Sequence, residues 1–191
     1  MKYVQKISDL KIEIDQLKQS YLEIIQNIKT WKKDEQNLHD FNAICINQMP
    51  NDPSSISGGN VRGLYWTYPS EKWEEEERSN KIDESRYTEI CEIFKKTYVE
   101  EVYNQIIKKW SIGRLRFLMK PPRSCLSWHR DPERRLHIPI ITNPGCRMVI
   151  EDECFHMPAD GSIYITDNRK YHNFFNGGEI ERIHLVGTLI E

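Results

Sequence analysis

Three side chains of this sequence have the types and the spacing to share one metal ion. His129 and Asp131 are separated by one residue, and His172 follows 41 residues after Asp131. On an extended chain, residues i and i+2 point to the same face, so the first two side chains can reach one ion. Each feature alone is common as a surface pair or a structural histidine. Together, two histidines and one carboxylate predict a facial triad with open positions, which suits non-haem Fe(II) and oxygen chemistry.

A cation follows the last predicted ligand at a short distance. Arg182 lies ten residues after His172, across an Asn-Gly-Gly-Glu turn that we expect to return the next strand beside the ligand strand. A buried guanidinium needs a partner, and it matches a carboxylate with two hydrogen bonds. The 5-carboxylate of 2-oxoglutarate is such a partner if the 2-oxo acid end of this co-substrate chelates the iron, where O2 also reacts. Pairing of Arg182 with a protein carboxylate is the alternative.

A second pair of polar residues lies close to the predicted triad. Arg135 and His137 share one face of a strand predicted at 134–142, while Leu136 and Ile138 take the other face. This strand begins just after the second predicted ligand, so either polar side chain could reach the co-substrate. Structural pairing within the protein is the alternative for both.

The elements that must position these residues are short strands. From residue 113 onward the chain alternates between short apolar runs and turn signals such as Pro-Pro-Arg, Asn-Pro-Gly and Asn-Gly-Gly-Glu. The predicted strands cover 113–119, 125–130, 134–142, 146–151, 153–158, 161–166, 171–176 and 181–190. Short antiparallel strands at this density predict a closed or nearly closed sandwich of the jelly-roll or cupin kind.

The N-terminal part predicts mainly helices. Apolar residues recur at a 3-4 spacing through residues 3–33, which predicts one long helix, and a second helix is predicted at 83–110. The stripe of the first helix consists of Ile7, Leu10, Ile14, Leu17, Tyr21, Ile24, Ile28 and Trp31. Strands are predicted at 41–49 and 61–69. We expect the first helix to pack on the second, and a homodimer through the first helix is the alternative.

Length and composition limit the classes of protein that remain. A chain of 191 residues predicts one α+β domain, with residues 1–110 as a helical and strand extension of a core at 111–191. The net charge of −2 gives no reason to expect nucleic acid as a partner. The sequence shows no apolar run long enough to span a membrane and no signal segment for secretion. We therefore expect a cytoplasmic protein. Five scattered cysteines predict reduced thiols.

Residues 112–191 resemble the aspartyl/asparaginyl β-hydroxylase family of Fe(II)- and 2-oxoglutarate-dependent oxygenases. Three segments carry the resemblance: SWHRDPERRLHIPI at 127–140, ADGSIYITDN at 159–168 and YHNFFNGGEIERIHLVG at 171–187. Their shared features are His-x-Asp, an Arg-Leu-His-Ile-Pro strand, a glycine before an apolar strand, and a histidine ten residues before an arginine.

The resemblance implies a double-stranded β-helix fold braced by N-terminal helices. It implies His129 and His172 as iron ligands and Arg182 as the anchor of 2-oxoglutarate. It also suggests Arg135 at the iron-proximal carboxylate of the co-substrate, with His137 nearby. Some members of the family lack the acidic ligand, whereas this sequence has Asp131 and is expected to form the full triad.

Two other classes of function remain open beside a hydroxylase. One is a cupin-like metalloenzyme that does not use 2-oxoglutarate, and the other is a non-catalytic oligomeric binding protein. A requirement for 2-oxoglutarate separates the first from the hydroxylase, and a lack of Fe(II) binding would favour the second. The helical N-terminal part matches no family motif, so the substrate is only expected to be an amino acid, another small molecule, a peptide or a protein.

Overall fold

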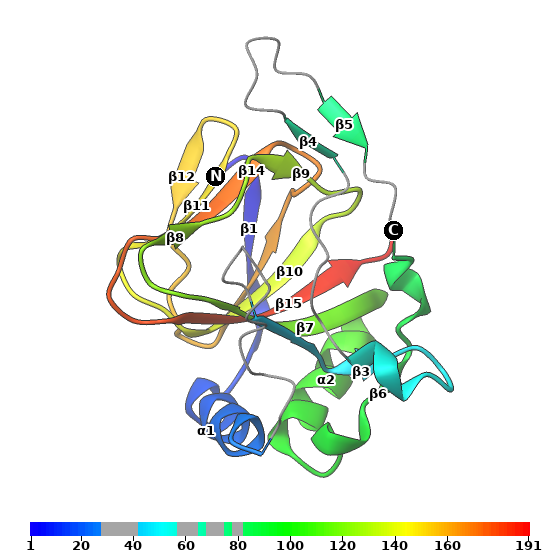
Figure 1. Ribbon diagram of the computed structural model, residues 1–191. Coiled ribbons are helices and arrows are strands. Elements are labelled where there is room, and N and C mark those ends of the chain that lie inside the picture. Colours follow the sequence, from blue (N-terminus) through cyan, green and yellow to red (C-terminus); the bar gives the residue numbers. More distant parts are fainter. Residues whose placement is uncertain (28–41, 57–64, 68–74, 78–81) are drawn as a thin grey trace.

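Two β-sheets face each other and form the centre of the molecule (Figure 1). The computed structural model describes residues 1–27, 42–56, 65–67, 75–77 and 82–191. The first sheet has the order β1 (Val4–Lys11), β13 (Ser162–Thr166), β10 (Arg135–Ile141), β15 (Arg182–Leu189), β7 (Ile112–Lys120) and β2 (Asn42–Cys45). The second has the order β12 (Glu153–Phe155), β11 (Cys146–Ile150), β14 (His172–Asn176), β9 (His129–Arg130), β4 (Tyr65–Thr67) and β5 (Glu75–Glu77), with β8 (Ser124–Cys125) also paired to β14.

This arrangement confirms the predicted jelly-roll or cupin-like fold. Of the strands predicted between residues 113 and 190, seven are present with bounds that differ by a few residues, and the one predicted at 125–130 is divided into β8 and β9. The strand predicted at 41–49 is divided into β2 and β3 (Asn47–Gln48), and β3 pairs with β6 (Glu89–Ile90). Of the strand predicted at 61–69, β4 is present, and residues 61–64, 68 and 69 lie outside the described residues.

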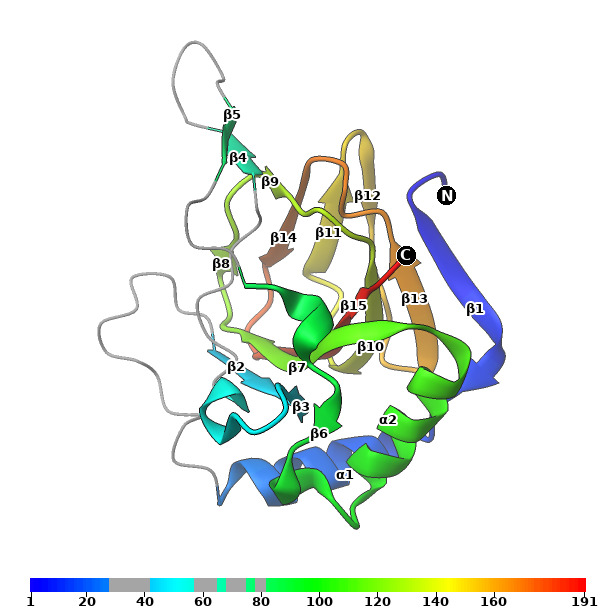
Figure 2. The same ribbon diagram turned by 90° about the vertical axis from the view of Figure 1, so that its right-hand side faces the viewer.

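Two helices cover the outer face of the first sheet (Figure 2). They are α1 (Ile14–Ile25) and α2 (Tyr98–Lys109), and their buried side chains join one core with those of the sheet. The strands contribute alternate residues to this core, among them Leu136, Ile138, Ile183 and Leu185. The expected packing of the first helix on the second is therefore confirmed for α1 and α2.

The prediction of one helix over residues 3–33 is wrong at its start. Residues 4–11 form β1, an edge strand that pairs antiparallel with β13 (Figure 2). Its buried residues Val4 and Ile7 are three apart because they lie on opposite faces of the strand: Val4 packs in one apolar cluster and Ile7 in the other, which the two helices share. That spacing imitates a helix. Ile28 and Trp31 of the predicted stripe lie outside the described residues, and a homodimer through this segment stays a prediction.

The prediction of one helix over 83–110 is also wrong in its first half. This segment forms two short 3-10 turns, η3 (Glu84–Arg86) and η4 (Glu92–Phe94), with β6 between them. Helical geometry ends after Phe94, because Lys95 is extended and Lys96 has a left-handed backbone with φ of 61°. The Thr97 hydroxyl then accepts a hydrogen bond from the Val99 N–H at 3.2 Å, and this N-cap begins α2.

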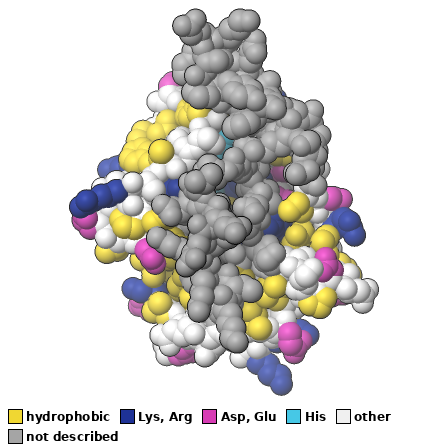
Figure 3. All heavy atoms as spheres, in the orientation of Figure 1, with side chains coloured by type: hydrophobic (Ala, Val, Ile, Leu, Met, Phe, Trp, Pro, Cys, Tyr) yellow, Lys and Arg dark blue, Asp and Glu magenta, His cyan; other side chains and the backbone are white. Residues whose placement is uncertain are grey.

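The described surface carries charges of both signs. On the face shown in Figure 3, the basic and acidic side chains of the described residues lie among apolar ones. Within the described residues, no helix is long and apolar enough to span a membrane.

Candidate metal centre and adjoining pocket

Two neighbouring strands place the two predicted histidine ligands side by side. His129 on β9 and His172 on β14 are direct partners in the antiparallel register. Their ring centroids lie 4.2 Å apart. Asp131 follows the end of β9, where its backbone N–H donates to the Asn168 carbonyl at 2.8 Å. The three residues are buried, and their ligand atoms all lie within 4.8 Å of one another, so the group could hold a metal ion.

Backbone carbonyls determine which nitrogen of each ring is available to a metal. Nδ1 of His129 lies 2.6 Å from the Ser127 carbonyl, and Nδ1 of His172 lies 3.0 Å from the Lys170 carbonyl. A carbonyl only accepts, so each Nδ1 carries the proton and each Nε2 keeps its lone pair. Burial, together with the neighbouring His129, lowers the pKa of His172 to about 4. His172 is therefore neutral at pH 7, the form that binds a metal.

Asp131 is charged although it is buried. Burial alone would raise its pKa, but the adjacent Arg135 guanidinium and the two histidines hold the pKa of Asp131 below its usual range. Arg135 donates from Nε to one carboxylate oxygen of Asp131 at 2.9 Å. The second carboxylate oxygen remains for a cation.

Asn168 contacts the triad through its side chain, a feature that the sequence did not indicate. Its amide nitrogen donates to Nε2 of His172 at 2.9 Å, and its side-chain oxygen accepts from the Thr166 hydroxyl at 2.5 Å. Nε2 of His172 has only one lone pair. A metal ion and the Asn168 amide therefore compete for the same atom, and the amide must move aside when an ion binds.

A pocket of about 650 Å³, measured with its open mouth, lies between the two sheets and reaches the triad. Its apolar wall includes Leu118, Leu126, Met148, Phe174 and Val186. Its cationic side chains are Arg116, Lys120, Arg135 and Arg182. Among the described lining residues, Asp131 is the only carboxylate. The pocket therefore suits an anionic ligand better than a neutral or cationic one.

Arg182 borders this pocket as a buried cation. Its guanidinium lies 3.6 Å from the centroid of the Phe174 ring, and one Nη donates to Nδ1 of His184 at 2.5 Å. Its Nε has no hydrogen-bond partner, and no carboxylate of the described residues forms an ion pair with it. Burial lowers the pKa of Arg182 to about 9. A buried guanidinium without a carboxylate partner indicates that an anionic ligand from outside the protein pairs with Arg182.

The expected hairpin between the ligand strand and the strand of Arg182 is not formed. β14 lies in the second sheet, whereas β15 pairs with β10 and β7 in the first sheet. The Asn-Gly-Gly-Glu segment therefore crosses from one sheet to the other. As a result, Arg182 faces the pocket from the sheet opposite to His172.

His137 lines the same pocket as the triad and Arg182, as expected for a residue that could reach the co-substrate. Its side chain is buried at the pocket, and both of its ring nitrogens lack a hydrogen-bond partner among the described residues. Burial and the positive charge of Arg182 lower its pKa well below 6.5. His137 is therefore a neutral ring with one N–H to donate and one nitrogen to accept.

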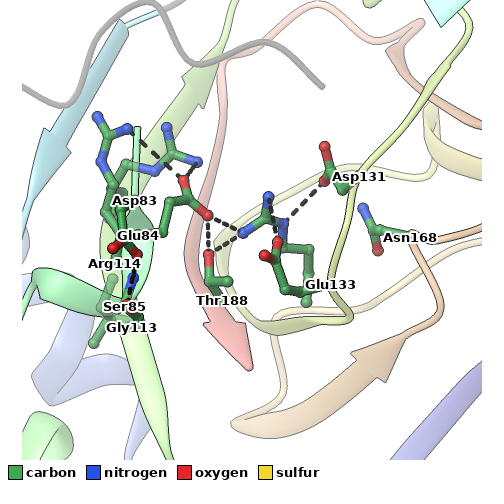
Figure 4. A network of polar contacts seen from close by, with 12 residues as sticks. Asp83, Glu84, Ser85, Gly113, Arg114, Asp131, Glu133, Asn168 and Thr188 are labelled. Atoms are coloured by element: carbon green, nitrogen blue, oxygen red, sulfur yellow. Dashed lines mark hydrogen bonds and ion pairs between the residues drawn. The ribbon is translucent and has the colours of Figure 1, made fainter. Parts of the chain in front are cut away.

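Arg135 is held by protein groups on several sides, and Figure 4 labels its partners Glu84, Asp131 and Thr188. Besides Asp131, its guanidinium contacts the carboxylate of Glu84 and the hydroxyl of Thr188. Structural pairing, the alternative considered for Arg135, is thus present, and a contact of Arg135 with a co-substrate stays a prediction. The sequence did not indicate Glu84, because an acidic residue in the segment Asp-Glu-Ser-Arg has the composition of an exposed turn.

Comparison with known proteins gives a match over most of the chain. A family model described as aspartyl/asparaginyl β-hydroxylase matches residues 13–190. An oxidoreductase of the 2OG-Fe(II) oxygenase family from Burkholderia pseudomallei has a similar structure, with a TM-score of 0.51 and 13% identity over 97% of this chain and 84% of its own. The structure of IDO from Bacillus thuringiensis is also similar, with a TM-score of 0.54 and 11% identity over 99% of this chain and 90% of its own. These identities show a shared fold, and no curated protein matches the sequence.

Proposed function

Since the chain belongs to the aspartyl/asparaginyl β-hydroxylase family and is a 2-oxoglutarate-dependent hydroxylase, we propose that His129, Asp131 and His172 hold its iron. The substrate proposed is an amino acid, or a side chain of a peptide or protein. The observation that carries the assignment is the convergence of three buried ligand atoms within 4.8 Å, with Nε2 of each histidine unprotonated and that of His172 available once the Asn168 amide moves aside. Such a set covers one face of an octahedral ion and leaves other positions to ligands.

The pocket beside the triad fits 2-oxoglutarate. This co-substrate is a dianion, and Arg182 is a buried cation without a carboxylate partner among the described residues. A carboxylate placed on Arg182 would form a charge-assisted pair in a pocket of low dielectric. We assign Arg182 to the carboxylate distant from the iron. We further propose that His137, whose ring nitrogens are also unsatisfied, donates to the end of the co-substrate nearer the iron.

The residues of the chain would orient the iron ligands and shield the site from water, while the bound Fe(II) with its co-substrates would supply the oxidation. Fe(II) with 2-oxoglutarate and O2 supplies the oxidising power that converts a C–H bond into an alcohol, with succinate and CO2 as the other products. Arg135 keeps Asp131 ionised and directs one of its oxygens away from the ion. The carbonyls of Ser127 and Lys170 fix both imidazoles in one tautomer. Leu118, Met148 and Val186 exclude water from the pocket wall.

The activity can be tested before the substrate is known. The purified protein, supplied with Fe(II), ascorbate and O2, should convert 2-oxoglutarate to succinate slowly, and His129→Ala should not. Mixtures of amino acids and peptides are then screened by mass spectrometry for the gain of one oxygen atom together with faster succinate release. Metal-dependent turnover that does not need 2-oxoglutarate would instead indicate the cupin-like alternative.

A further inference from the structure

We propose that Glu84, a residue of the N-terminal part of the chain, is a positioning residue for the metal centre and acts on Asp131 through Arg135. This inference rests on the proposed function, because it assumes that Asp131 is a ligand. It assigns part of residues 1–110 a role in the site, although these residues carry no motif of the metal centre.

The contacts form a continuous buried chain (Figure 4). One carboxylate oxygen of Glu84 accepts from Nη1 of Arg135 and from the hydroxyl of Thr188. Nε of the same guanidinium donates to Asp131 at 2.9 Å. Thr188 contacts both Glu84 and Arg135, so it closes a triangle at one end of the guanidinium. A planar guanidinium that is fixed at Nη1 has little freedom to turn about its other donor. The position of Nε, and with it that of Asp131, therefore depends on Glu84.

Three local features hold the turn that carries Glu84 close to the first sheet. A Cβ on Gly113 would lie 2.5 Å from the Glu84 carbonyl oxygen, so only glycine allows the turn η3 to approach β7. The buried Asn47 amide donates to the carbonyls of Tyr87 and Gly113 at 2.7 Å each, and so ties the end of the turn to the strand. Asp83 caps the turn by accepting from the Ser85 N–H at 3.1 Å. These interactions hold the turn against the first sheet.

The charges explain why a carboxylate is required at this position. Arg114 and Arg116 also lie near Glu84, at 3.7 and 3.6 Å from its other carboxylate oxygen. Glu84 thus compensates three buried guanidinium groups, whose mutual repulsion in a low dielectric would otherwise be large. Without its negative charge, Arg135 would be repelled from Arg114 and Arg116 and would lose the contact that orients it. A neutral amide of the same shape cannot replace this function.

A merely structural role predicts a different result from a positioning role. If Glu84 only stabilised the fold, or if its charge acted on the ion directly through space, its effect on metal affinity would not depend on Arg135. If Glu84 acts by orienting Arg135, the effect must disappear once that guanidinium is removed. A double-mutant cycle between the two residues measures this dependence.

The experiment is a Co(II) titration, followed by the visible absorption of the ion, of the full chain and of Glu84→Gln, Arg135→Gln and the double variant. We expect Glu84→Gln to weaken Co(II) binding about tenfold in the native background and less than about twofold in the Arg135→Gln background, by analogy with residues that orient metal ligands. Glu92→Gln is the matched control, since Glu92 lies on the same segment but is exposed and pairs only with Lys95 among the described residues. Its affinity should equal that of the native chain.

Thr188 provides a second route if Glu84→Gln does not fold. Thr188→Val removes the hydroxyl that joins Glu84 and Arg135 and keeps the shape of the side chain, while Thr188→Ser restores the hydroxyl. The valine variant should weaken Co(II) binding and the serine variant should not. Equal affinities in all Glu84 and Thr188 variants, or an equal loss in both backgrounds of the cycle, would overturn the role of Glu84 alone. A native chain that binds no Co(II) would overturn the proposed iron site as well.

Discussion

His129 and His172 present their Nε2 atoms toward one point, and a backbone carbonyl holds the opposite nitrogen of each ring. Replacement of either histidine by alanine should abolish measurable Mn(II) binding. The fold should persist, because each ring lies at the pocket and outside both apolar clusters. Calorimetric titration with Mn(II), with circular dichroism as the check on folding, tests this prediction.

His156→Ala is the control for the histidine variants. Its ring nitrogen lies 2.9 Å from the Cys146 carbonyl, outside the triad. This variant should bind Mn(II) as the native chain does. Undiminished affinity in both His129→Ala and His172→Ala would rule out the proposed triad.

Arg182 should determine the affinity for the co-substrate and leave the metal site unchanged. Arg182→Ala removes a buried charge-assisted pair, which is worth roughly 1.5–3 kcal/mol, or about ten- to a hundredfold in the KM for 2-oxoglutarate. Succinate production at varied 2-oxoglutarate concentration measures this change, and Mn(II) titration measures the metal site. Arg123→Ala, which removes only an exposed ion pair with Glu179, serves as the control. An unchanged KM for Arg182→Ala would transfer the anchor to another residue.

At the scale of single residues, the polar residues whose spacing reflects a strand were predicted from the sequence. Glu84 and Asn168 were missed, because their contacts depend on packing between segments and on the conformation of a connection. His129 and Asp131 are two residues apart, and the alternation of β10 places Arg135 and His137 on the pocket side. Glu84 approaches the site only because η3 packs on β7, a contact between distant segments. Asn168 lies four residues before His172, in the connection from β13 to β14, and its contact with the ring depends on the conformation of that connection. Neither contact leaves a periodic signal in the sequence.

Among the elements, β1 depends on one glycine that lies at the start of its partner strand. Gly161 has a left-handed φ of 81°, and a Cβ there would lie 2.1 Å from the carbonyl oxygen of Ile12. Gly161→Ala should therefore destabilise the protein by roughly 2–4 kcal/mol, because backbone strain and the displacement of the strand end add together. Urea unfolding measures the change in the free energy of unfolding.

Gly177→Ala is the matched control for this element. A Cβ on Gly177 would meet its nearest atom, the Gly145 carbonyl oxygen, at 3.4 Å, and its φ is not left-handed. Its stability should stay within about 0.5 kcal/mol of the native value, as for most surface substitutions. Equal stabilities of Gly161→Ala and Gly177→Ala would contradict the close approach of Ile12 to Gly161.

Element types were predicted well where the local pattern decides them and poorly where packing overrides it. The strands after residue 112 have clear turn residues between them and were found, except that the one predicted at 125–130 is divided into β8 and β9. β1 was taken for a helix, because this edge strand is buried on both faces, with Val4 in one apolar cluster and Ile7, three residues later, in the other. The segment before α2 was taken for helix because Ile90, Phe94 and Tyr98 recur every four residues, although two 3-10 turns and the left-handed Lys96 separate them.

For the molecule as a whole, buried neutral histidines predict a loss of stability in acid. The folded pKa values of His137, His172 and His184 lie below the ordinary 6.5, because burial disfavours the charged ring. Below pH 6.5 the unfolded chain binds protons that the folded chain does not. The contribution of these rings is thus complete above pH 6.5 and falls as the pH drops toward their folded pKa values, about 4 for His172.

Urea unfolding of the metal-free protein between pH 7.5 and 5 measures this effect. Each histidine contributes a slope of about 1.4 kcal/mol per pH unit in the lower part of the window. In the His137→Gln variant, the slope of the free energy of unfolding against pH should decrease by about the contribution of one histidine. A stability that does not change across this window would contradict the neutral state of the three rings.

The central claim is that one molecule of this fold holds Fe(II) on His129, Asp131 and His172 and 2-oxoglutarate between that ion and Arg182. Anaerobic addition of 2-oxoglutarate to the Fe(II)-loaded protein tests it most directly, because a 2-oxo acid that chelates Fe(II) produces a visible charge-transfer band. We predict that the band appears in the native chain, requires both components, is absent in His172→Ala, and needs more 2-oxoglutarate in Arg182→Ala. A native chain that binds Fe(II) and gives no band, or a band of equal strength in His172→Ala, would contradict the account.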